Sequence, residues 1–205
     1  IKYAETFYPE ILPNLSTCKS PQQMFGAAAK TYYAQKIGVP ADKVFVVSIM
    51  PCTAKKFEAQ RPEMNSSGVR DVDVVHTTRE LGRMIKQAGI QFDLLPDTEM
   101  DAPLGASTGA ADIFANTGGV MEAALRTAYE LVTGRPLPDI KIEGQQRGVL
   151  EGVKMASLQI NDPLPDWKFL DGQTLNVAVA HGLSNARRII EEVQAGRQSV
   201  HFVEV

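Results

Sequence analysis

Cys52 and Lys55 have the residue types and the spacing that suit chemistry at a metal centre. A cysteine thiolate binds soft metals and iron–sulfur clusters. Lys55 follows three residues later, about one helical turn, so its ammonium can lie on the same side as the thiol and stabilise an anionic cluster or ligand. The alternative interpretation is a buried core thiol beside a surface lysine, because free cysteines are among the most buried residues.

The apolar run before Cys52 predicts the element that positions it. Residues 43–49 are almost continuously apolar, which is typical of a strand covered on both faces in a parallel sheet. Ligands of open α/β sheets gather at the carboxyl ends of such strands, and segment 50–55 lies at that end. Residues 21–37 predict a helix before the strand, with Ser20 as its N-cap.

Similar signals predict the elements that follow. A second strand is expected at 73–76. Thr77 comes directly after it and Glu80 three residues later, the spacing of a capping box, which predicts a helix that ends at Gly89. Residues 96–117 show little periodicity and predict an ordered loop, and long ordered loops inside compact domains are often functional.

The second half of the chain predicts an α/β arrangement. In order, we expect a helix at 118–132, strands at 145–160 and 175–180, a helix from the cap Ser184 to Ala195, and a strand at 200–205. A strand, a helix and a further strand form a β-α-β unit, whose crossover should be right-handed. Apolar strands between amphipathic helices place the chain in the α/β class.

Composition and charge exclude several classes of function. The 205 residues are 44% hydrophobic and 22% charged, which is typical of a globular protein. The net charge of −3, without a basic run, argues against nucleic-acid binding. No apolar run approaches the roughly 20 residues that span a bilayer. Two cysteines do not predict a disulfide framework.

Four segments resemble iron-only (FeFe) hydrogenases, in the order and spacing of that family. Residues 50–58, Met-Pro-Cys-Thr-Ala-Lys-Lys-Phe-Glu, resemble the second of three signature motifs. Residues 15–26 resemble the segment after the first motif, and residues 107–114 and 118–126 resemble the stretch between the second and third. The resemblance covers essentially the whole chain, and several ordered matches are far more specific than one motif.

The resemblance implies a fold and a domain. The expected architecture has largely parallel twisted sheets flanked by helices, in two α/β lobes around a buried metal-cluster cleft, with a boundary near 96–117. Residues 1–205 then form part of the hydrogenase H-cluster domain, truncated at both ends. The first cysteine motif of the family would lie upstream of Ile1 and the third downstream of Val205, so the chain alone is expected to be inactive.

The resemblance also implies cofactors and residue roles. The family holds a 4Fe-4S cluster with four cysteines and a two-iron subcluster that carries carbonyl and cyanide ligands. Cys52 matches a ligand of the 4Fe-4S cluster, and Lys55 matches the lysine that hydrogen-bonds a cyanide. The residues that match the wall of the two-iron pocket are Pro21, Gln22, Met50, Pro51, Phe114 and Val120. For the wall residues, the alternative is ordinary core packing.

Three further polar residues need separate interpretations. Ser16 matches a serine on the proton path of the family, and a hydroxyl can both accept and donate a proton; the alternative is a cap or turn residue. Glu58 is a second catalytic candidate beside Lys55, although a structural ion pair is at least as good an interpretation. Cys18 matches no ligand position and is interpreted as a structural thiol.

The function that the resemblance implies is an oxidoreductase that interconverts molecular hydrogen with protons and electrons. Its partners would be a ferredoxin or cytochrome and the remaining hydrogenase sequence or a small subunit, in the cytoplasm or the periplasm. Two alternatives stay open: a hydrogenase-like iron–sulfur assembly protein and a non-catalytic structural fragment. Lys55 and the pair Pro21 and Gln22 argue for the hydrogenase, because a protein without cyanide ligands has no need for that cation.

Overall fold

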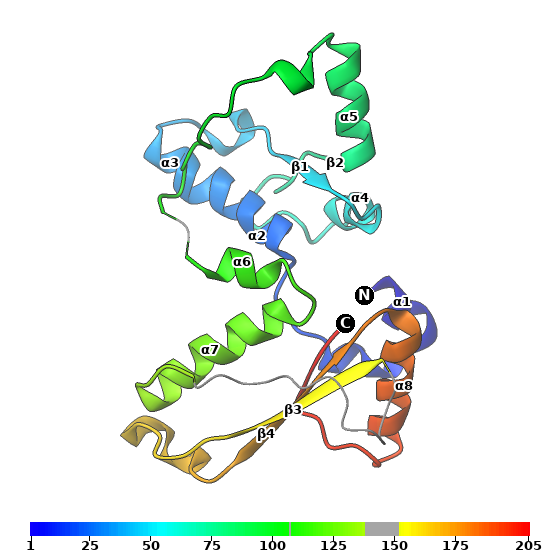
Figure 1. Cartoon of the computed structure of the whole chain (residues 1–205), viewed down its shortest axis with the longest axis vertical. Helices are drawn as coiled ribbons and strands as arrows, with labels where there is room; N and C mark the ends of the chain where they lie inside the picture. Colours follow the sequence, from blue (N-terminus) through cyan, green and yellow to red (C-terminus); the bar gives the residue numbers. More distant parts are fainter. Residues whose placement is uncertain (107, 138–151) are drawn as a thin grey trace. The chain divides into compact units, whose positions relative to one another are not determined.

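A computed structural model describes residues 1–106, 108–137 and 152–205 (Figure 1). The chain divides into two compact units, Ile1–Ala106 and Ser107–Val205, and each is a separate arrangement of helices around a small sheet. The α/β class is therefore confirmed. Among the described residues, no helix is both long and apolar enough to cross a membrane.

The first unit contains short helices and a parallel pair of strands. Its elements are α1 (Lys2–Phe7), the 3-10 helix η1 (Pro9–Asn14), α2 (Pro21–Ala28), the π turn η2 (Ala29–Tyr33), α3 (Ala34–Lys36), the 3-10 turn η3 (Ala41–Lys43), β1 (Val47–Met50), α4 (Ala54–Ala59), β2 (Val74–Thr77), α5 (Thr78–Gln87) and η4 (Phe92–Leu94). β1 and β2 pair in parallel, with Val47 opposite Val74 and Met50 opposite Thr77. The predicted helix at 21–37 is confirmed as the continuous series α2, η2 and α3.

The strand predicted at 43–49 is shorter and shifted. Residues 41–43 form the turn η3, and β1 begins only at Val47, because the carboxylate of Asp73 accepts the N–H of Val46 in place of a strand partner. The prediction that both faces of this strand are buried is wrong for the described residues. Val46 is buried, whereas Val47 and Ile49, on the opposite face, are 47% and 40% exposed.

The start of α2 also differs from the prediction. Ser20 makes no side-chain cap, and its buried hydroxyl has no hydrogen-bond partner within the described part of the chain. The helix is instead held by the segment between α4 and β2. Gly26 lies so close to that segment that a Cβ would come within 2.5 Å of the carbonyl oxygen of Asp71.

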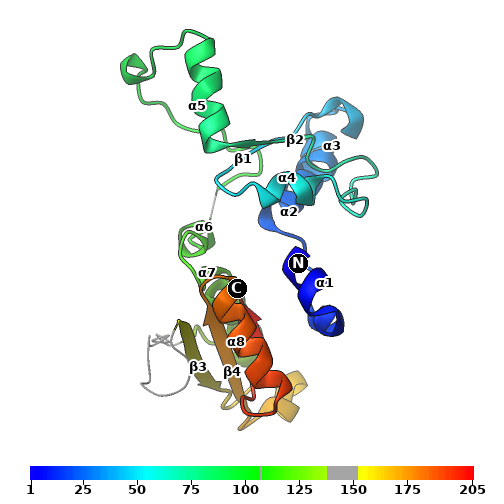
Figure 2. The same ribbon diagram turned by 90° about the vertical axis from the view of Figure 1, so that its right-hand side faces the viewer.

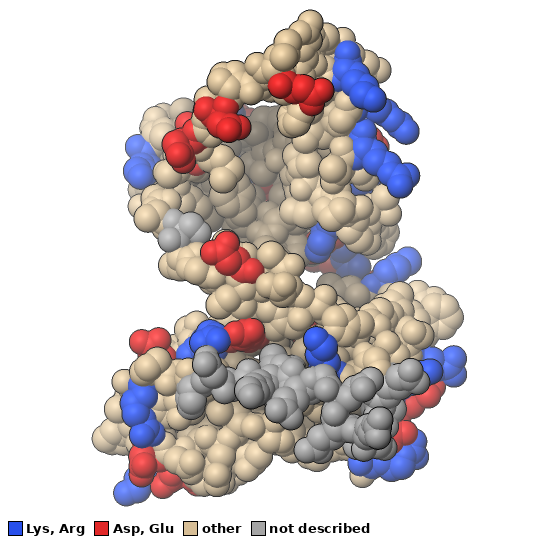
Figure 3. All heavy atoms as spheres, viewed as in Figure 1, with Lys and Arg blue, Asp and Glu red and all other residues tan. Residues whose placement is uncertain are grey.

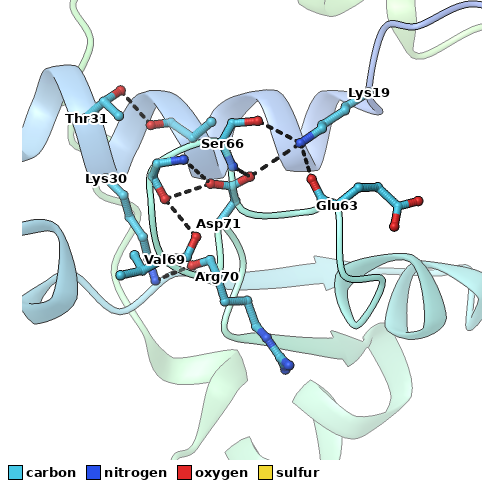
Figure 4. A network of polar contacts seen from close by, with 10 residues as sticks. Lys19, Lys30, Thr31, Glu63, Ser66, Val69, Arg70 and Asp71 are labelled. Carbon is cyan, nitrogen blue, oxygen red and sulfur yellow. Dashed lines mark hydrogen bonds and ion pairs between the residues drawn. The ribbon is translucent and has the colours of Figure 1, made fainter.

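Polar contacts from Lys19 and Lys30, which lie before and after α2, reach the segment 60–73 (Figure 4). Lys30, on the π turn, is buried and bonds to the carboxylate of Asp73 at 2.7 Å. Asp71 is fully buried; although burial by itself raises its pKa, hydrogen bonds from Ser67 and Ser66 hold the pKa below the usual range. Lys19 reaches the same loop through the carbonyl of Glu63.

The capping box at the start of α5 is confirmed. The hydroxyl of Thr77 accepts the N–H of Glu80 at 3.2 Å, and the Glu80 carboxylate accepts the N–H of Thr77 at 2.7 Å. The ammonium of Lys56, 2.7 Å from the same carboxylate, and the N–H of Thr77 lower the pKa of Glu80 from 4.5 to about 2. Glu80 therefore stays ionised in the folded protein at pH values where it is protonated in the unfolded chain.

We expect Glu80→Gln to lower stability at neutral pH and to lose this effect in acid. Glutamine can still complete a capping box, so the substitution removes mainly the charge. Because the folded-state pKa is depressed, the contribution of Glu80 is complete above about pH 4.5 and disappears as the pH falls through about 2. Urea unfolding of both proteins between pH 7 and pH 2 would test this expectation. Glu99→Gln is the control, and a stability difference that does not change with pH would contradict it.

The second unit is a three-stranded sheet between two helices (Figure 2). Its elements are α6 (Ala110–Phe114), α7 (Gly119–Thr133), β3 (Val153–Gln159), η5 (Pro165–Leu170), β4 (Thr174–Ala180), α8 (Leu183–Gln194) and β5 (Phe202–Glu204). Successive residues of β4 point to opposite faces. Val177 and Val179 pack against α7, whereas Ala178 and Ala180 pack against α8.

The direction of the strands in this sheet was predicted only in part. β4 and β5 are parallel and joined by α8, which confirms the β-α-β unit. β3 pairs with β4 in the antiparallel direction, so the second sheet is mixed. The loop of 14 residues between the two strands closes as a hairpin, because Ile160 donates its N–H to the carbonyl of Gln173 at 2.9 Å and accepts the N–H of Gly172 at 2.8 Å, which continues the antiparallel ladder.

Several predicted boundaries in the second unit are corrected. The expected loop at 96–117 contains the helix α6. α8 begins at Leu183 with Gly182 as its N-cap, so Ser184 lies inside the helix and does not cap it. The strand predicted at 145–160 is observed as β3, and residues 145–151 lie outside the described residues. The last strand, predicted at 200–205, spans only Phe202–Glu204.

Charged side chains are spread over the face drawn in Figure 3. Basic and acidic groups lie interspersed on both units, with a basic group over α5, where Arg79, Arg83 and Lys86 are exposed. On that face, the described residues form no continuous basic stripe of the kind that neutralises a phosphate backbone.

Candidate metal-cluster site

Cys52 lies in the turn between β1 and α4. Its carbonyl oxygen accepts the N–H of Lys55 at 3.3 Å, which closes the first turn of α4. The thiol is free and exposed, so the alternative of a buried core thiol does not describe Cys52. A thiol at the carboxyl end of a parallel strand is available to an external ligand, because neither a disulfide nor the packed core occupies it. Its role as a cluster ligand stays a prediction.

Lys55 is not a fully solvated lysine. Its Nζ lies 3.0 Å from Oε2 of Glu58, one turn further along α4, and the two side chains are 32% and 13% exposed. An ammonium has three donors, and Glu58 accepts one of them. Lys55 therefore combines a fixed position with donors that remain for an anionic ligand.

Gln22 joins this ion pair to the rest of the first unit. Its Nε2 donates to Oε2 of Glu58 at 3.1 Å and to the carbonyl of Lys55 at 3.2 Å. Its Oε1 accepts the hydroxyl of Ser48 at 2.8 Å. Residues from α2, β1 and α4 thus form one network, and Ser48 is a member that the sequence did not single out. The available signal was a polar residue inside an apolar run.

No polar contact joins the other predicted residues of the first unit to this network within the described part of the chain. Pro21 and Pro51 are exposed, at the first position of α2 and directly after β1. Met50 is half-buried and packs against the core of the unit. Ser16 is exposed, and its hydroxyl accepts the N–H of Cys18 at 3.1 Å, a turn contact that agrees with the alternative interpretation of this residue. Cys18 itself is exposed and free.

Phe114 and Val120 belong to the second unit. They are 39% and 42% exposed, so neither is part of the apolar core, and core packing does not account for them. Phe114 lines an open hollow of about 400 Å³ at the carboxyl ends of β4 and β5, together with His181 and Glu204. The parts of the chain that the structure describes contain no group of three or more His, Cys, Asp or Glu residues placed to bind a metal ion.

A carboxylate that the sequence did not indicate holds the start of α7. Glu204, at the end of β5, accepts the N–H of Gly118 at 3.0 Å and the N–H of Met121 at 2.8 Å. The helix has no side-chain cap of its own, because its N-cap is Gly118. Glu204 satisfies two of the free N–H groups at this helix start and therefore fixes the turn that carries Val120.

The family model for the iron-only hydrogenase large subunit, C-terminal domain, matches residues 1–205. The chain belongs to this family. It is 51% identical to the NADP-reducing hydrogenase subunit HndD of Solidesulfovibrio fructosivorans over 205 residues, which are 100% of this chain and 33% of that protein. It is also 51% identical to the periplasmic iron hydrogenase large subunit of Nitratidesulfovibrio vulgaris, covering 99% of this chain and 45% of that protein. The chain thus spans a third to a half of the length of these relatives.

The chain is also similar to a solved structure and to a more distant relative. The apo FeFe-hydrogenase HydA1 from Chlamydomonas reinhardtii is similar with a TM-score of 0.78 and 41% identity, over 98% of this chain and 55% of that one. The cytosolic iron-sulfur assembly component 3 of Rattus norvegicus is 30% identical over 212 residues, with 42% of that protein covered. The family therefore has relatives with two kinds of function, and the hydrogenases are the more similar.

Proposed function

We propose that the intact protein is an FeFe hydrogenase, an oxidoreductase that interconverts molecular hydrogen with protons and electrons. The observation that carries this proposal is the pairing of the exposed thiol of Cys52 with the half-buried ammonium of Lys55, one helical turn away. Identity of 51% to two relatives that are named as hydrogenases supports it. The proposal concerns the intact protein, because one thiolate cannot hold a cluster that takes four.

The proposed cofactors are a 4Fe-4S cluster, with Cys52 as one of its ligands, and a two-iron subcluster with carbonyl and cyanide ligands beside Lys55. The residues present fit these groups. Cys52 is free for a metal, and Lys55 keeps donors that Glu58 does not use. When bound, the cofactor supplies the redox chemistry, and the protein supplies position and electrostatics.

In this proposal, the polar side chains near the cofactor have separate roles. Lys55 makes a charge-assisted hydrogen bond to an anionic ligand, which is stronger than a bond between neutral groups. Its ammonium donates to the carboxylate of Glu58, and Gln22 donates to the same carboxylate. Ser16 is proposed for the proton path, because its hydroxyl accepts the N–H of Cys18 and can still donate its own proton.

The pocket wall is the proposed role of the remaining candidates. Pro21, Met50, Pro51, Phe114 and Val120 carry no charge, and a polarizable methionine among apolar walls suits a dry cavity for a small neutral gas. Exposure of Phe114 and Val120 supports a role outside the core of the second unit.

The proposed partners follow from the reaction. Electrons would pass to or from a ferredoxin or a cytochrome, and the remaining hydrogenase sequence or a small subunit would complete the domain. Both the cytoplasm and the periplasm are compatible with this proposal, and one relative is named as periplasmic.

An iron–sulfur assembly protein is the second candidate, because relatives with that name match the whole chain at 30% identity. The two candidates make different demands on Lys55. A protein that holds no cyanide does not need a half-buried cation beside its cluster thiol. The network of Gln22, Glu58 and Lys55 therefore favours the hydrogenase.

The experiment that tests the function uses the intact protein, matured with its cofactors. We expect hydrogen evolution with a reduced electron carrier and infrared bands of carbonyl and cyanide. A 4Fe-4S protein without these bands and without hydrogen evolution would support the assembly protein instead.

We expect Lys55→Met in the same protein to reduce occupancy of the two-iron subcluster severely while the 4Fe-4S cluster is retained. The cyanide would lose its one cationic donor in a site of low dielectric constant, where an unpaired charge is costly. Lys56→Met is the matched control, because Lys56 bonds to Val75 and Glu80. Infrared bands and bound iron give the measurement. Unchanged cyanide frequencies at full occupancy in Lys55→Met would mean that this lysine points elsewhere.

A further inference from the structure

We propose that Ser48 is a positioning residue of the candidate site: its hydroxyl anchors the amide of Gln22, and this amide holds the Lys55–Glu58 ion pair. The inference rests on the proposed function for its meaning, because it assigns Lys55 to an anionic ligand. Its geometry stands on contacts within the first unit alone.

The first step is the position of Ser48 in β1. Side chains alternate along the strand, and Ser48 is buried at 8% exposure between the exposed residues Val47 and Ile49. A hydroxyl on the inner face of a strand is costly unless it is hydrogen-bonded. Valine or alanine would fill that place without this cost. The serine is therefore explained by its bond to Gln22, at 2.8 Å.

The second step is the direction of the hydrogen bonds at Gln22, whose side chain is also buried. The Glu58 carboxylate and the carbonyl of Lys55 can only accept, so the amide nitrogen of Gln22 must face them. The amide oxygen then faces β1, where the hydroxyl of Ser48 donates to it. Without this donor, Oε1 of Gln22 would be buried and without a hydrogen bond. That cost would favour another conformation of the Gln22 side chain.

The third step connects Gln22 to the ammonium. Oε2 of Glu58 accepts from Nε2 of Gln22 at 3.1 Å and from Nζ of Lys55 at 3.0 Å. The glutamine therefore fixes the carboxylate, and the carboxylate fixes the ammonium. A shift of Gln22 would release Glu58 and let the ammonium of Lys55 move into solvent.

The test compares Ser48→Ala, Ser48→Cys and Ser48→Thr in the intact protein. Ser48→Cys keeps the volume of the side chain with a weak donor, and Ser48→Thr restores a hydroxyl with a residue that strands favour. Ser157→Ala is the matched control, because Ser157 also donates to an amide oxygen at 2.8 Å, that of Asn176 in the second unit. Circular dichroism and thermal melting confirm that each variant is folded.

The first readout needs no cofactor. Exchange of the Lys55 ammonium protons with water is followed by nitrogen-15 NMR. We expect exchange to be about tenfold faster in Ser48→Ala, because the ion pair loses its support, with a smaller effect in Ser48→Cys. Ser48→Thr and Ser157→Ala should behave like the parent. Parent-like exchange in Ser48→Ala, or equally fast exchange in Ser157→Ala, would overturn the proposal.

The second readout uses the protein with its cofactors bound. We expect the cyanide bands of Ser48→Ala to shift and those of Ser157→Ala to stay in place. Unshifted bands in Ser48→Ala would refute the link between Ser48 and the ligand of Lys55. If the parent shows no cyanide bands while exchange is still faster in Ser48→Ala, the anchoring of Lys55 holds and the proposed function fails, so the two failures are distinguishable.

Discussion

Cys52→Ala in the intact protein should remove the 4Fe-4S cluster and the hydrogenase activity together. Cys52 is a free, exposed thiol at the end of β1, and we propose it as one of four cluster ligands. Loss of a ligand opens the cluster to water. Even residues that only support metal ligands contribute about 10–100-fold to metal affinity, so we expect cluster retention to fall by more than about 100-fold.

Bound iron, visible absorption and hydrogen evolution measure this effect. Cys18→Ala is the matched control, because Cys18 is the other free and exposed thiol of the chain and matches no ligand position. We expect Cys18→Ala to keep its iron. A normal iron–sulfur spectrum in Cys52→Ala would remove Cys52 from the set of ligands, and the assignment of the pocket beside it would have to be made again.

Gly119→Ala should destabilise the second unit strongly. Gly119 is the first residue of α7, and a Cβ there would lie 1.8 Å from the carbonyl oxygen of Ile113 in α6. The obstacle is backbone, so a rotamer change cannot relieve it. Overpacking usually costs about 1–3 kcal/mol, and we expect a loss of at least about 3 kcal/mol here because a helix must move.

The stability measurement is urea unfolding of the intact protein. Gly82→Ala is the control, because Gly82 lies inside α5 and a Cβ there meets nothing within 4 Å. That substitution should stabilise the protein by up to about 1 kcal/mol, since alanine favours a helix. If Gly119→Ala were as stable as the parent, α6 and α7 would not approach so closely. The relative position of Phe114 and Val120, which these helices carry, would then need another explanation.

Local patterns determined those parts of the protein that depend on neighbours in the sequence. The capping box of Thr77 and Glu80 was predictable because all of its bonds join residues three apart. The end of α7 at Gly134 was predictable for a similar reason, since its φ of 68° suits glycine. The turn that places Cys52 and Lys55 one helical turn apart is equally local.

The tertiary structure decided the features that join distant residues. The carboxylate of Glu58 was visible in the sequence, but its bond to Gln22 spans 36 residues and depends on how α2 packs beside α4. Ser48 gained its role only because β1 turns that side chain toward α2. The cap of α7 comes from Glu204, which lies 83 residues beyond Met121.

The sequence by itself determined the family, the α/β class and the residues that are candidates for chemistry at the site. These features depend on motifs and hydrophobic periods, which are local. Only the tertiary structure decided strand direction and hydrogen-bond partners. The sequence of β3 is compatible with either direction, and its antiparallel pairing with β4 is seen only in the backbone hydrogen bonds that close the loop between them as a hairpin. The partner of a buried polar group is likewise decided by packing, because burial makes a hydrogen bond obligatory and only the fold determines which donor lies within reach.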